Sequence, residues 1–262
     1  AVVQMALATA LGMGAAWAWG WTGGEGLVFG LSLSCASTVV LLKALESRRL
    51  LETMNGRIAV GWLVVEDLAT VVVLVLLPPL AGVLGGTDVP NPDGHPLWRT
   101  VVQTLLQVAA FVATMLIAGR RVLPWLLWQV SQTGSRELFT LAVVAAAISI
   151  AYGAAALFGV SFALGAFFAG MVMRESQFSH RAAEESLPLR DAFAVLFFVS
   201  VGMLFEPAVL ADEPLRVLAV VAIIVLGKSV AAAGLVLLLR YPLNTALTVA
   251  ASLGQIGEFS FI

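Results

Sequence analysis

Residues 56–78, GRIAVGWLVVEDLATVVVLVLLP, form the stretch that decides the fold. It is apolar and long enough to cross a lipid bilayer as one helix, which takes about 20 residues. Two acidic residues, Glu66 and Asp67, lie about ten residues inside it. A helix rises about 1.5 Å per residue, so we expect this pair about 15 Å deep, near the middle of a hydrocarbon core of about 30 Å.

A charge at that depth predicts a functional site, because burying it there costs about 2.5–3.5 kcal/mol on insertion scales. Two adjacent carboxylates repel each other, so we expect one of them to hold a proton readily. Neighbouring residues of a helix point about 100° apart, so only one of Glu66 and Asp67 needs to line a pathway. The alternative is a helix-end pair that reaches the membrane interface, which the depth of the pair makes the weaker interpretation.

The composition of the chain indicates a membrane protein. Of its 262 residues, 60% are hydrophobic and 11% are charged, whereas about a quarter of a soluble domain is charged. Lipid must therefore cover most of the surface. The single cysteine, Cys35, excludes an intrachain disulfide and a multi-cysteine metal cluster, and we expect it to be a small packing residue. No basic tract is present, so we expect no nucleic-acid partner.

Nine apolar stretches are predicted to be membrane spans: 1–21, 26–45, 57–80, 100–118, 137–157, 160–174, 191–210, 214–239 and 244–262. Of the 14 Lys and Arg residues, 11 lie in one alternate set of connecting loops, 2 lie in the other set, and Lys228 lies inside a span. The arginine-rich loops are predicted to be cytoplasmic. The loop from Gly82 to Trp98 is then outside. The chain opens and stops inside apolar runs, so we expect it to be a fragment of a longer membrane domain.

Three further spans carry polar residues near mid-membrane. Lys228 lies near the middle of 214–239, where a buried ammonium needs a carboxylate partner or must give up its proton. It belongs to a functional site or to a purely structural ion pair. Small and polar residues cluster in 26–45 and 244–262, where a helix can break and expose backbone groups. These residues are Ser32, Ser34, Ser37 and Thr38 in the first case, and Ser252, Gly254, Gln255, Gly257 and Glu258 in the second. Helix packing by small residues is the alternative, but it does not explain Gln255 and Glu258.

The two clusters lie on spans of opposite direction, because the charge rule runs 26–45 inward and 244–262 outward. Antiparallel helices that are both interrupted at mid-membrane are typical of an inverted-repeat transporter with its site at the midplane. The ends of half-helices offer partial charges there. The carboxylate pair and Lys228 are expected in the same layer.

At these residues the sequence resembles the bacterial cation:proton antiporter-2 family, and within it the Kef-type potassium/proton antiporter branch. The resemblance rests on ASTVVLLKALESRRLLETMNGRIAVGWLVVEDL, SFALGAFFAGMVMRES, LPLRDAFAVLFFVSVGMLFEP, GKSVAA and AASLGQIGEFSFI, in the same order along the chain. It implies an all-α membrane fold with inverted repeats and two crossed discontinuous helices. It also implies a first core repeat (1–80), linking and dimer-domain helices (81–210) and the start of a second core repeat (211–262).

The resemblance assigns roles to the polar residues. It implies that Asp67 binds the cation and the proton, with Glu66, Ser37 and Thr38 beside it. Lys228 and Glu258 are implied to compensate charge, and Gly254, Gln255 and Gly257 to form the second break. It further implies a homodimer in the bacterial inner membrane, exchange of K⁺ or Na⁺ for protons without a cofactor, and a C-terminal nucleotide-binding regulatory domain that this chain lacks.

Three other functions compete with exchange. A passive cation channel would use the same polar layer without coupling to protons. A retinal-binding protein expects seven helices with the lysine on the last, whereas Lys228 lies on the eighth of nine expected spans. An intramembrane protease needs a membrane histidine or two facing aspartates, but His95 and His180 lie in expected loops and Asp67 is the only deeply placed Asp.

Overall fold

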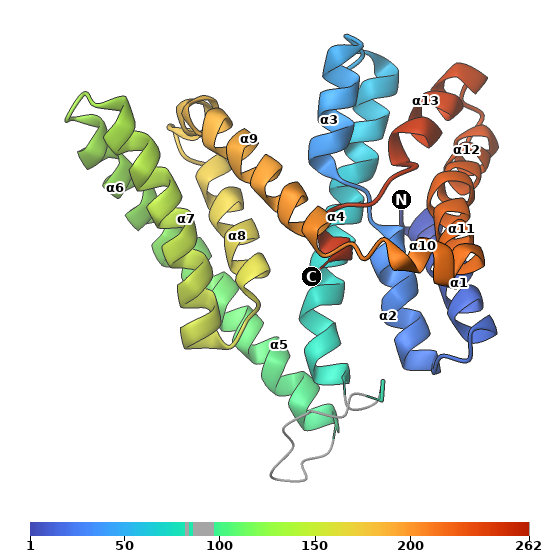
Figure 1. Cartoon of the computed structure of the whole chain (residues 1–262). Coiled ribbons are helices and arrows are strands. Elements are labelled where there is room, and N and C mark those ends of the chain that lie inside the picture. The colour runs from blue at the N-terminus through green and yellow to red at the C-terminus, as the bar shows by residue number, and fades with distance from the viewer. Residues whose placement is uncertain (82–83, 86–96, 262) are drawn as a thin grey trace. The chain divides into compact units, whose positions relative to one another are not determined.

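The fold is helical throughout the residues that the computed structural model describes, 1–81, 84–85 and 97–261 (Figure 1). In chain order the helices are α1 (Val2–Ala18), α2 (Gly23–Ser34), α3 (Thr38–Ser47), α4 (Met54–Leu80), α5 (Leu97–Thr114), α6 (Arg120–Ser131), α7 (Arg136–Phe158), α8 (Phe162–Arg174), α9 (Ser179–Met203), α10 (Ala208–Asp212), α11 (Pro214–Ala222), α12 (Lys228–Leu238) and α13 (Leu243–Leu253). Two π-helical turns, η1 (Met115–Gly119) and η2 (Ile223–Gly227), and a 3-10 turn, η3 (Glu258–Ser260), complete the list.

Six helical stretches are long and apolar enough to cross a membrane: Gly23–Ser47, Met54–Leu77, Val101–Ser131, Arg136–Phe158, Ser179–Met203 and Pro214–Leu238. Three shorter apolar helices, α1, α8 and α13, lie within the other three expected segments. The all-helical, multi-pass membrane fold is therefore confirmed, and the count of nine spans stays a prediction. His95 and most of the loop expected outside lie beyond the described residues.

The expected seventh segment, 191–210, is wrong at both ends, because α9 runs from Ser179 to Met203. Its first half is rich in charged residues and was expected to be a loop. Glu, Arg and Ala are good helix formers, so polarity alone does not stop a helix there. After Met203 the chain leaves the helix ahead of Pro207, and proline disfavours helical geometry in the residue before it.

The described residues cluster into two compact units. Unit 1 is formed from Ala1–Val73, Ala81–Val89 and Pro207–Ile262, and unit 2 from Leu74–Leu80 and Pro90–Glu206. Helix α4 therefore begins in unit 1, and its last turns belong to unit 2. That these units serve as a transport core and a dimer domain, with boundaries near 80 and 210, stays a prediction.

Glycines let α1 and α2 approach closely in unit 1. A Cβ atom on Gly12 of α1 would lie 2.5 Å from the Cα of Gly30 on α2, and one on Gly30 would overlap the backbone of Thr9. Gly26 and Gly30 are one turn apart on α2, and Gly26 faces Ala16 of α1. Small residues at such a spacing are typical of membrane helices that pack backbone to backbone.

A buried apolar cluster in unit 1 joins the four helices α3, α4, α12 and α13. Its largest members are Leu41 and Leu45 of α3, Leu63 of α4, Val236 of α12 and Leu253 of α13. Each is at most 2% exposed. The cluster holds the parts of the chain that flank the expected breaks.

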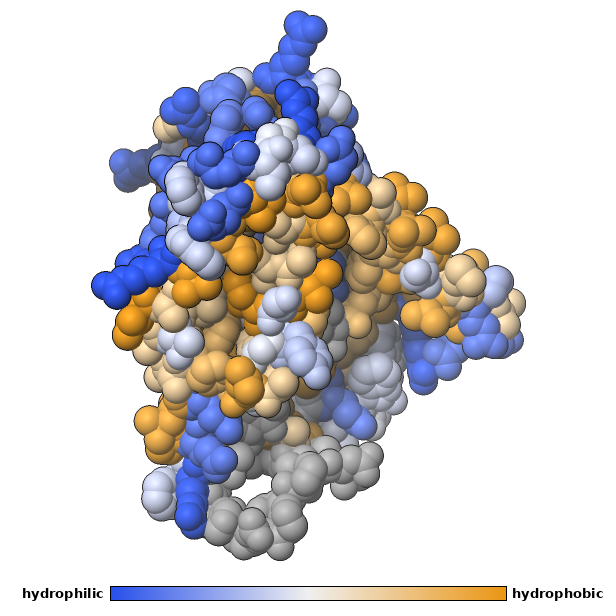
Figure 2. Space-filling model, turned by 90° about the vertical axis from the view of Figure 1, so that its left-hand side faces the viewer, coloured by the Kyte–Doolittle hydropathy of each residue, from blue (hydrophilic) through white to orange (hydrophobic). Residues whose placement is uncertain are grey.

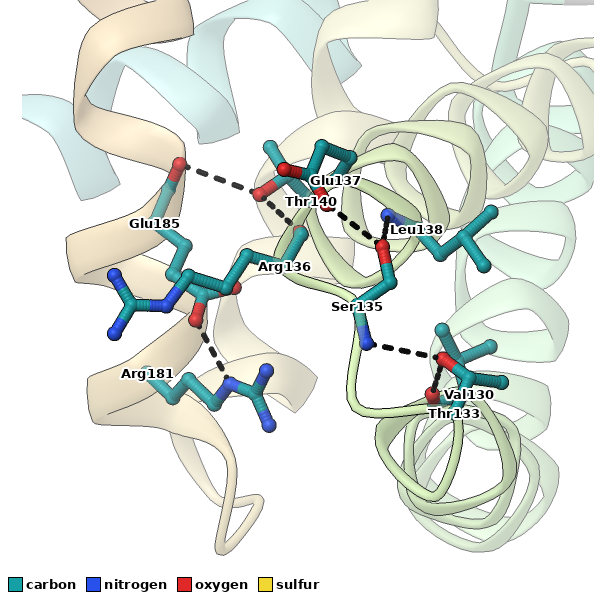
Figure 3. A network of polar contacts seen from close by, with 9 residues as sticks. All are labelled: Val130, Thr133, Ser135, Arg136, Glu137, Leu138, Thr140, Arg181 and Glu185. Atoms are coloured by element: carbon teal, nitrogen blue, oxygen red, sulfur yellow. Dashed lines mark hydrogen bonds and ion pairs between the residues drawn. The ribbon is translucent and has the colours of Figure 1, made fainter.

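In unit 2, α7 and α8 form a tight pair, and polar contacts tie α7 to α9. Gly159 adopts a left-handed conformation, φ +65°, at the end of α7, and Gly165 of α8 packs against the backbone of Ala151. Figure 3 shows Arg181 of α9 paired with Glu185, whose carbonyl lies 3.5 Å from the Thr140 hydroxyl of α7. Of these two polar contacts, the one between Thr140 and Glu185 joins α7 to α9, and the ion pair lies within α9.

The surface is apolar over a broad band. Figure 2 shows hydrophobic residues across the middle of the drawn face, with hydrophilic residues gathered above them and in smaller groups below. Large apolar side chains such as Leu106, Leu141, Leu157 and Leu226 are more than 60% exposed. A surface of this kind is stable against lipid tails, as the composition predicts.

The glycine contact between α1 and α2 gives a prediction with opposite signs at two glycines of one helix. Replacing a helical glycine by alanine is ordinarily favourable by about 1 kcal/mol, so Gly14→Ala, with open space around it, should keep or raise thermal stability. Gly12→Ala should lower it by about 1–3 kcal/mol, because the new methyl group meets Gly30. Thermal unfolding of both variants in detergent measures the difference, and equal midpoints would contradict the contact.

Candidate functional site

The first polar cluster interrupts a helix in unit 1. Helix α2 ends at Ser34, the backbone is extended at Cys35 and Ser37, and α3 begins at Thr38. The Ser37 hydroxyl accepts a hydrogen bond from the backbone N–H of Val40 at 3.4 Å and so caps α3. The start of α3, with its free N–H groups and positive dipole end, therefore lies where Ser37 and Thr38 were expected to break the helix.

The second polar cluster interrupts another helix of the same unit. Helix α13 ends at Leu253, Gly257 is extended, and the turn η3 starts at Glu258. Gly254 packs against Ser229 of α12, since a Cβ on it would lie 2.8 Å from the Ser229 hydroxyl. One short turn is described after this break, so the crossing of two full discontinuous helices stays a prediction.

The two breaks meet through Gln255. The backbone N–H of Ser37 donates to Gln255 Oε1 at 2.9 Å, and Gln255 Nε2 donates to the Ser37 carbonyl at 3.1 Å. Gly257 lies against the same segment, where a Cβ would be 3.0 Å from the Ser37 nitrogen. One side-chain amide thus contacts both backbone groups of Ser37: it is the acceptor of the N–H, and it adds a second donor to a carbonyl that already accepts from the Leu41 N–H of α3 at 3.1 Å.

Lys228 joins the breaks from α12, directly after the π-turn η2. Its ammonium donates to the carbonyl of Cys35 at 2.9 Å and to the carbonyl of Gln255 at 2.6 Å. The side chain is fully buried. Lys228 was expected to have a carboxylate partner. Among the described residues its ammonium hydrogen-bonds to backbone carbonyls, one from each break, and the carboxylate that acts on it through its charge is Glu66, not Asp67.

Glu66 and Asp67 follow each other on α4 but serve different surroundings. Glu66 is fully buried and accepts from the backbone N–H of Ala36 at 3.2 Å. The charge of Lys228 acts on it. Asp67 is half-buried and accepts from the Thr38 hydroxyl at 2.9 Å. This division matches the angle of about 100° between neighbouring residues on a helix.

Glu258 lies on the Asp67 side of the site. It is partly buried at the start of η3, and its charge acts on Asp67. It was expected to compensate charge, but towards Asp67 it adds a second negative charge. Asp67 Oδ1 is buried and has no hydrogen-bond partner within the described residues. Oxygens of Asp67, Thr38 and Glu258 are the groups here that are able to hold a small cation.

The site contains residues that the sequence did not single out. The hydroxyl of Thr70, one turn after Glu66 on α4, donates to the Glu66 carbonyl at 2.9 Å and lies 2.7 Å from the Cys35 sulfur. Its spacing of four residues from Glu66 was a usable signal. No sequence pattern marked the carbonyls of Cys35 and Gln255, which accept from Lys228. His180 lies 3.1 Å from Glu184 at an exposed place in unit 2. No group of three His, Cys, Asp or Glu residues that could hold a metal ion is found within the described chain.

Comparison with known proteins identifies the family of this site. The family model for the transmembrane part of sodium/hydrogen exchangers matches residues 1–262, the whole chain. The chain belongs to the sodium/hydrogen exchanger family. Membership of this family places the chain among transporters rather than enzymes and accounts for its membrane-spanning helices.

Several curated relatives of this exchanger chain carry transport names. It is 57% identical over its full length to the putative cation/proton antiporter YbaL of Escherichia coli, strain K12, and covers 46% of that protein. It is 33% identical over 91% of its length to K(+) efflux antiporter 4 of Arabidopsis thaliana, and over 89% to the putative K(+) efflux antiporter KefB of Alkalimonas amylolytica. The chain spans 39% and 34% of these two proteins, so it matches half or less of each of the three.

The contact between the breaks yields a prediction about Gln255. Gln255→Leu removes the acceptor of the Ser37 N–H and leaves that group buried without a partner, whereas the Ser37 carbonyl loses one of two donors and keeps the N–H of Leu41. An unsatisfied buried group costs about 1–3 kcal/mol, so unfolding of the variant in detergent should occur at a clearly lower temperature. Gln103→Leu, at an exposed position of α5, is the matched control and should unfold like the unaltered protein. Equal midpoints for the two variants would mean that Gln255 does not hold the breaks together.

Proposed function

We propose that the chain is the ion-translocating part of a monovalent cation/proton antiporter that works by alternating access. The observation that carries the proposal is Asp67 Oδ1, a buried carboxylate oxygen that has no hydrogen-bond partner among the described residues, beside the helix breaks. An acceptor in that situation is destabilised by about 1–3 kcal/mol unless a donor or a cation reaches it. The oxygen can bind a proton or a cation, and each of these prevents the other from binding.

The surroundings of Asp67 favour a singly charged cation. Thr38 supplies a neutral hydroxyl oxygen, and Glu258 supplies a second, more distant negative charge. Hard cations bind such oxygens, and the three-acid clusters that hold divalent ions are not found in the described part of the chain. K⁺ is the cation we propose, with Na⁺ as the alternative, because two relatives are named as K⁺ efflux antiporters.

Exchange then follows from competition at one carboxylate. A cation binds when Asp67 is charged, with the Thr38 hydroxyl turning its oxygen lone pairs toward the ion. A proton that arrives at Asp67 removes the charge, and the cation leaves. Because the carboxylate carries one or the other, each change of access moves a cation in one direction or a proton in the opposite direction.

Lys228 takes a different part in this cycle from the one that an Asp67 ion pair would give it. Its ammonium remains on the carbonyls of Cys35 and Gln255 and faces the charge of Glu66. It thus neutralises the partial negative charges of the breaks and leaves the Asp67 side open to a mobile ion.

The relatives suggest the larger assembly. Because they are at least about twice as long as this chain, the complete protein is proposed to hold additional parts, among them a nucleotide-binding regulatory domain. We also propose that it forms a homodimer in the bacterial inner membrane. Exchange as such needs no cofactor in this scheme, since the ion and the proton are its substrates.

The central prediction concerns Asp67. Asp67→Asn keeps the size of the side chain and loses the titrating charge, so cation-driven proton movement in proteoliposomes of the complete protein should fall to the background level. Asp212→Asn, at an exposed position of α10, controls for the loss of an acidic residue and should exchange normally. Undiminished exchange by Asp67→Asn would refute the proposal, and cation flux in the unaltered protein that ignores a pH gradient would indicate a channel instead.

A second prediction separates the hydroxyl of Thr38 from its bulk. Thr38→Val replaces the oxygen that contacts Asp67 by a methyl group of similar size, and we expect the KM for the cation to rise about tenfold, as for loss of a hydrogen bond of about 1.5 kcal/mol. Thr38→Ser keeps the oxygen and should stay within about twofold of the unaltered protein. The cation dependence of proton flux measures both, and equal KM values for the two variants would remove Thr38 from the cation site.

A further inference from the structure

One carboxylate oxygen of Glu66 receives no hydrogen bond from the helix breaks. Its Oε2 atom accepts from Ala36, but Oε1 is buried and has no hydrogen-bond partner in the described part of the chain. Lys228 faces Glu66 from α12, and Asp67 follows it on its own helix. A buried carboxylate oxygen without a donor is costly. Trp62, one turn before Glu66 on α4, contacts helix α1 through Gln4, so α1 is where a donor is to be sought.

Helix α1 carries such a donor in Gln4. The side chain is fully buried. Its Oε1 atom accepts from the indole N–H of Trp62 at 3.5 Å, whereas its Nε2 atom, with two N–H groups to give, has no partner among the described residues. A free acceptor on α4 and a free donor on α1 therefore coexist inside unit 1.

Helix geometry brings these two groups towards each other. Trp62 and Glu66 are one turn apart on α4 and share a face, and a helical side chain lies over the turn that precedes its own Cα. Both side chains lean in the same direction along α4, so Glu66 stays one turn from Trp62 on the face where the Trp62 indole N–H holds the Gln4 amide. The backbone nitrogen of Ala1 is within electrostatic range of Glu66, and Gln4 lies in the same first turn of α1. The separation nevertheless exceeds a direct hydrogen bond, since none joins the two side chains.

We propose that one ordered water molecule bridges Gln4 Nε2 and Glu66 Oε1. The water accepts from the amide and donates to the carboxylate, which satisfies both groups. Buried waters are typically found where about two to four polar groups converge. Gln4 is then a positioning residue: it fixes the carboxylate that faces Lys228, and it touches neither the cation nor Asp67. The effect on transport rests on the proposed exchange function, whereas the water itself does not.

The structural test is a high-resolution electron cryo-microscopy map of the complete protein. Density for one water between Gln4 and Glu66 is expected, and it should be lost in Gln4→Met, which keeps the length of the side chain. A map of the unaltered protein without density in this gap would overturn the proposal.

A double-mutant cycle on unfolding in detergent tests the coupling without any need for transport. Gln4→Met should lower the folding equilibrium constant about tenfold, and Glu66→Met should lower it further, because it also removes the acceptor of the Ala36 N–H and the charge that acts on Lys228. The double variant should lose far less than the product of the two, because each single change already strands the other partner. Effects that multiply would show that the residues act separately and would overturn the bridge.

Transport kinetics separate positioning from cation binding. For Gln4→Met we expect the maximal exchange rate to fall about fivefold while the KM for the cation stays unchanged, as for loss of one hydrogen bond remote from the cation. Thr9→Val removes the other buried, unpartnered polar group of α1 and should behave as the unaltered protein. A changed KM or an equal loss in both α1 variants would contradict a positioning role. Absence of exchange in the unaltered protein, with the water and the coupling present, would refute the proposed function alone.

Discussion

The site depends on the hydrogen bonds that the Lys228 ammonium donates to the carbonyls of Cys35 and Gln255. A helix that stops inside a membrane exposes carbonyls that lipid is unable to satisfy, at a cost of several kcal/mol each. Lys228 takes one carbonyl from each break, and Gln255 takes both backbone groups of Ser37. The backbone groups of the first break are thus satisfied by Gln255 of the second break and by Lys228, which also binds the second break. Thr38 follows Ser37 directly, so these contacts also position its hydroxyl.

The turn between neighbouring residues of α4 separates two electrostatic environments. Glu66 faces a positive charge that never leaves, because it is part of the chain, and a backbone N–H of the first break. Asp67 faces a hydroxyl group and a second carboxylate. Two acids that would repel each other in one pocket are therefore kept apart by about 100° of helix rotation. Glu66 has an opposite charge within the protein, in Lys228, whereas Asp67 is the acid proposed to bind an ion from solution.

Depth along the apolar segments predicted the polar layer, because a bilayer of fixed thickness makes residue count a measure of position. Glu66, Asp67 and Lys228 were found in this way, and the small residues near Ser37 and Gly257 pointed to the breaks. The partners of Lys228 were not predictable, since backbone carbonyls have no letter in a sequence. The nearness of Glu258 to Asp67 and of Gln4 to Trp62 depends on how separate helices pack, which depth does not determine. The polar start of α9 was missed because charge and helicity are independent properties there.

The π-turn η2 places Lys228 in register with the breaks. A π-turn holds one residue more than the α-helical turn that it replaces, and η2 occupies Ile223–Gly227, immediately ahead of Lys228. If these five residues were instead wound as a regular α-helix, the segment after them would be rotated by about 100° relative to the segment before them. The lysine would then point away from the carbonyls that it now holds. The wide turn, and not the number of residues alone, therefore sets the direction of Lys228, whereas deletion of the extra residue together with the wide turn would leave that direction nearly unchanged.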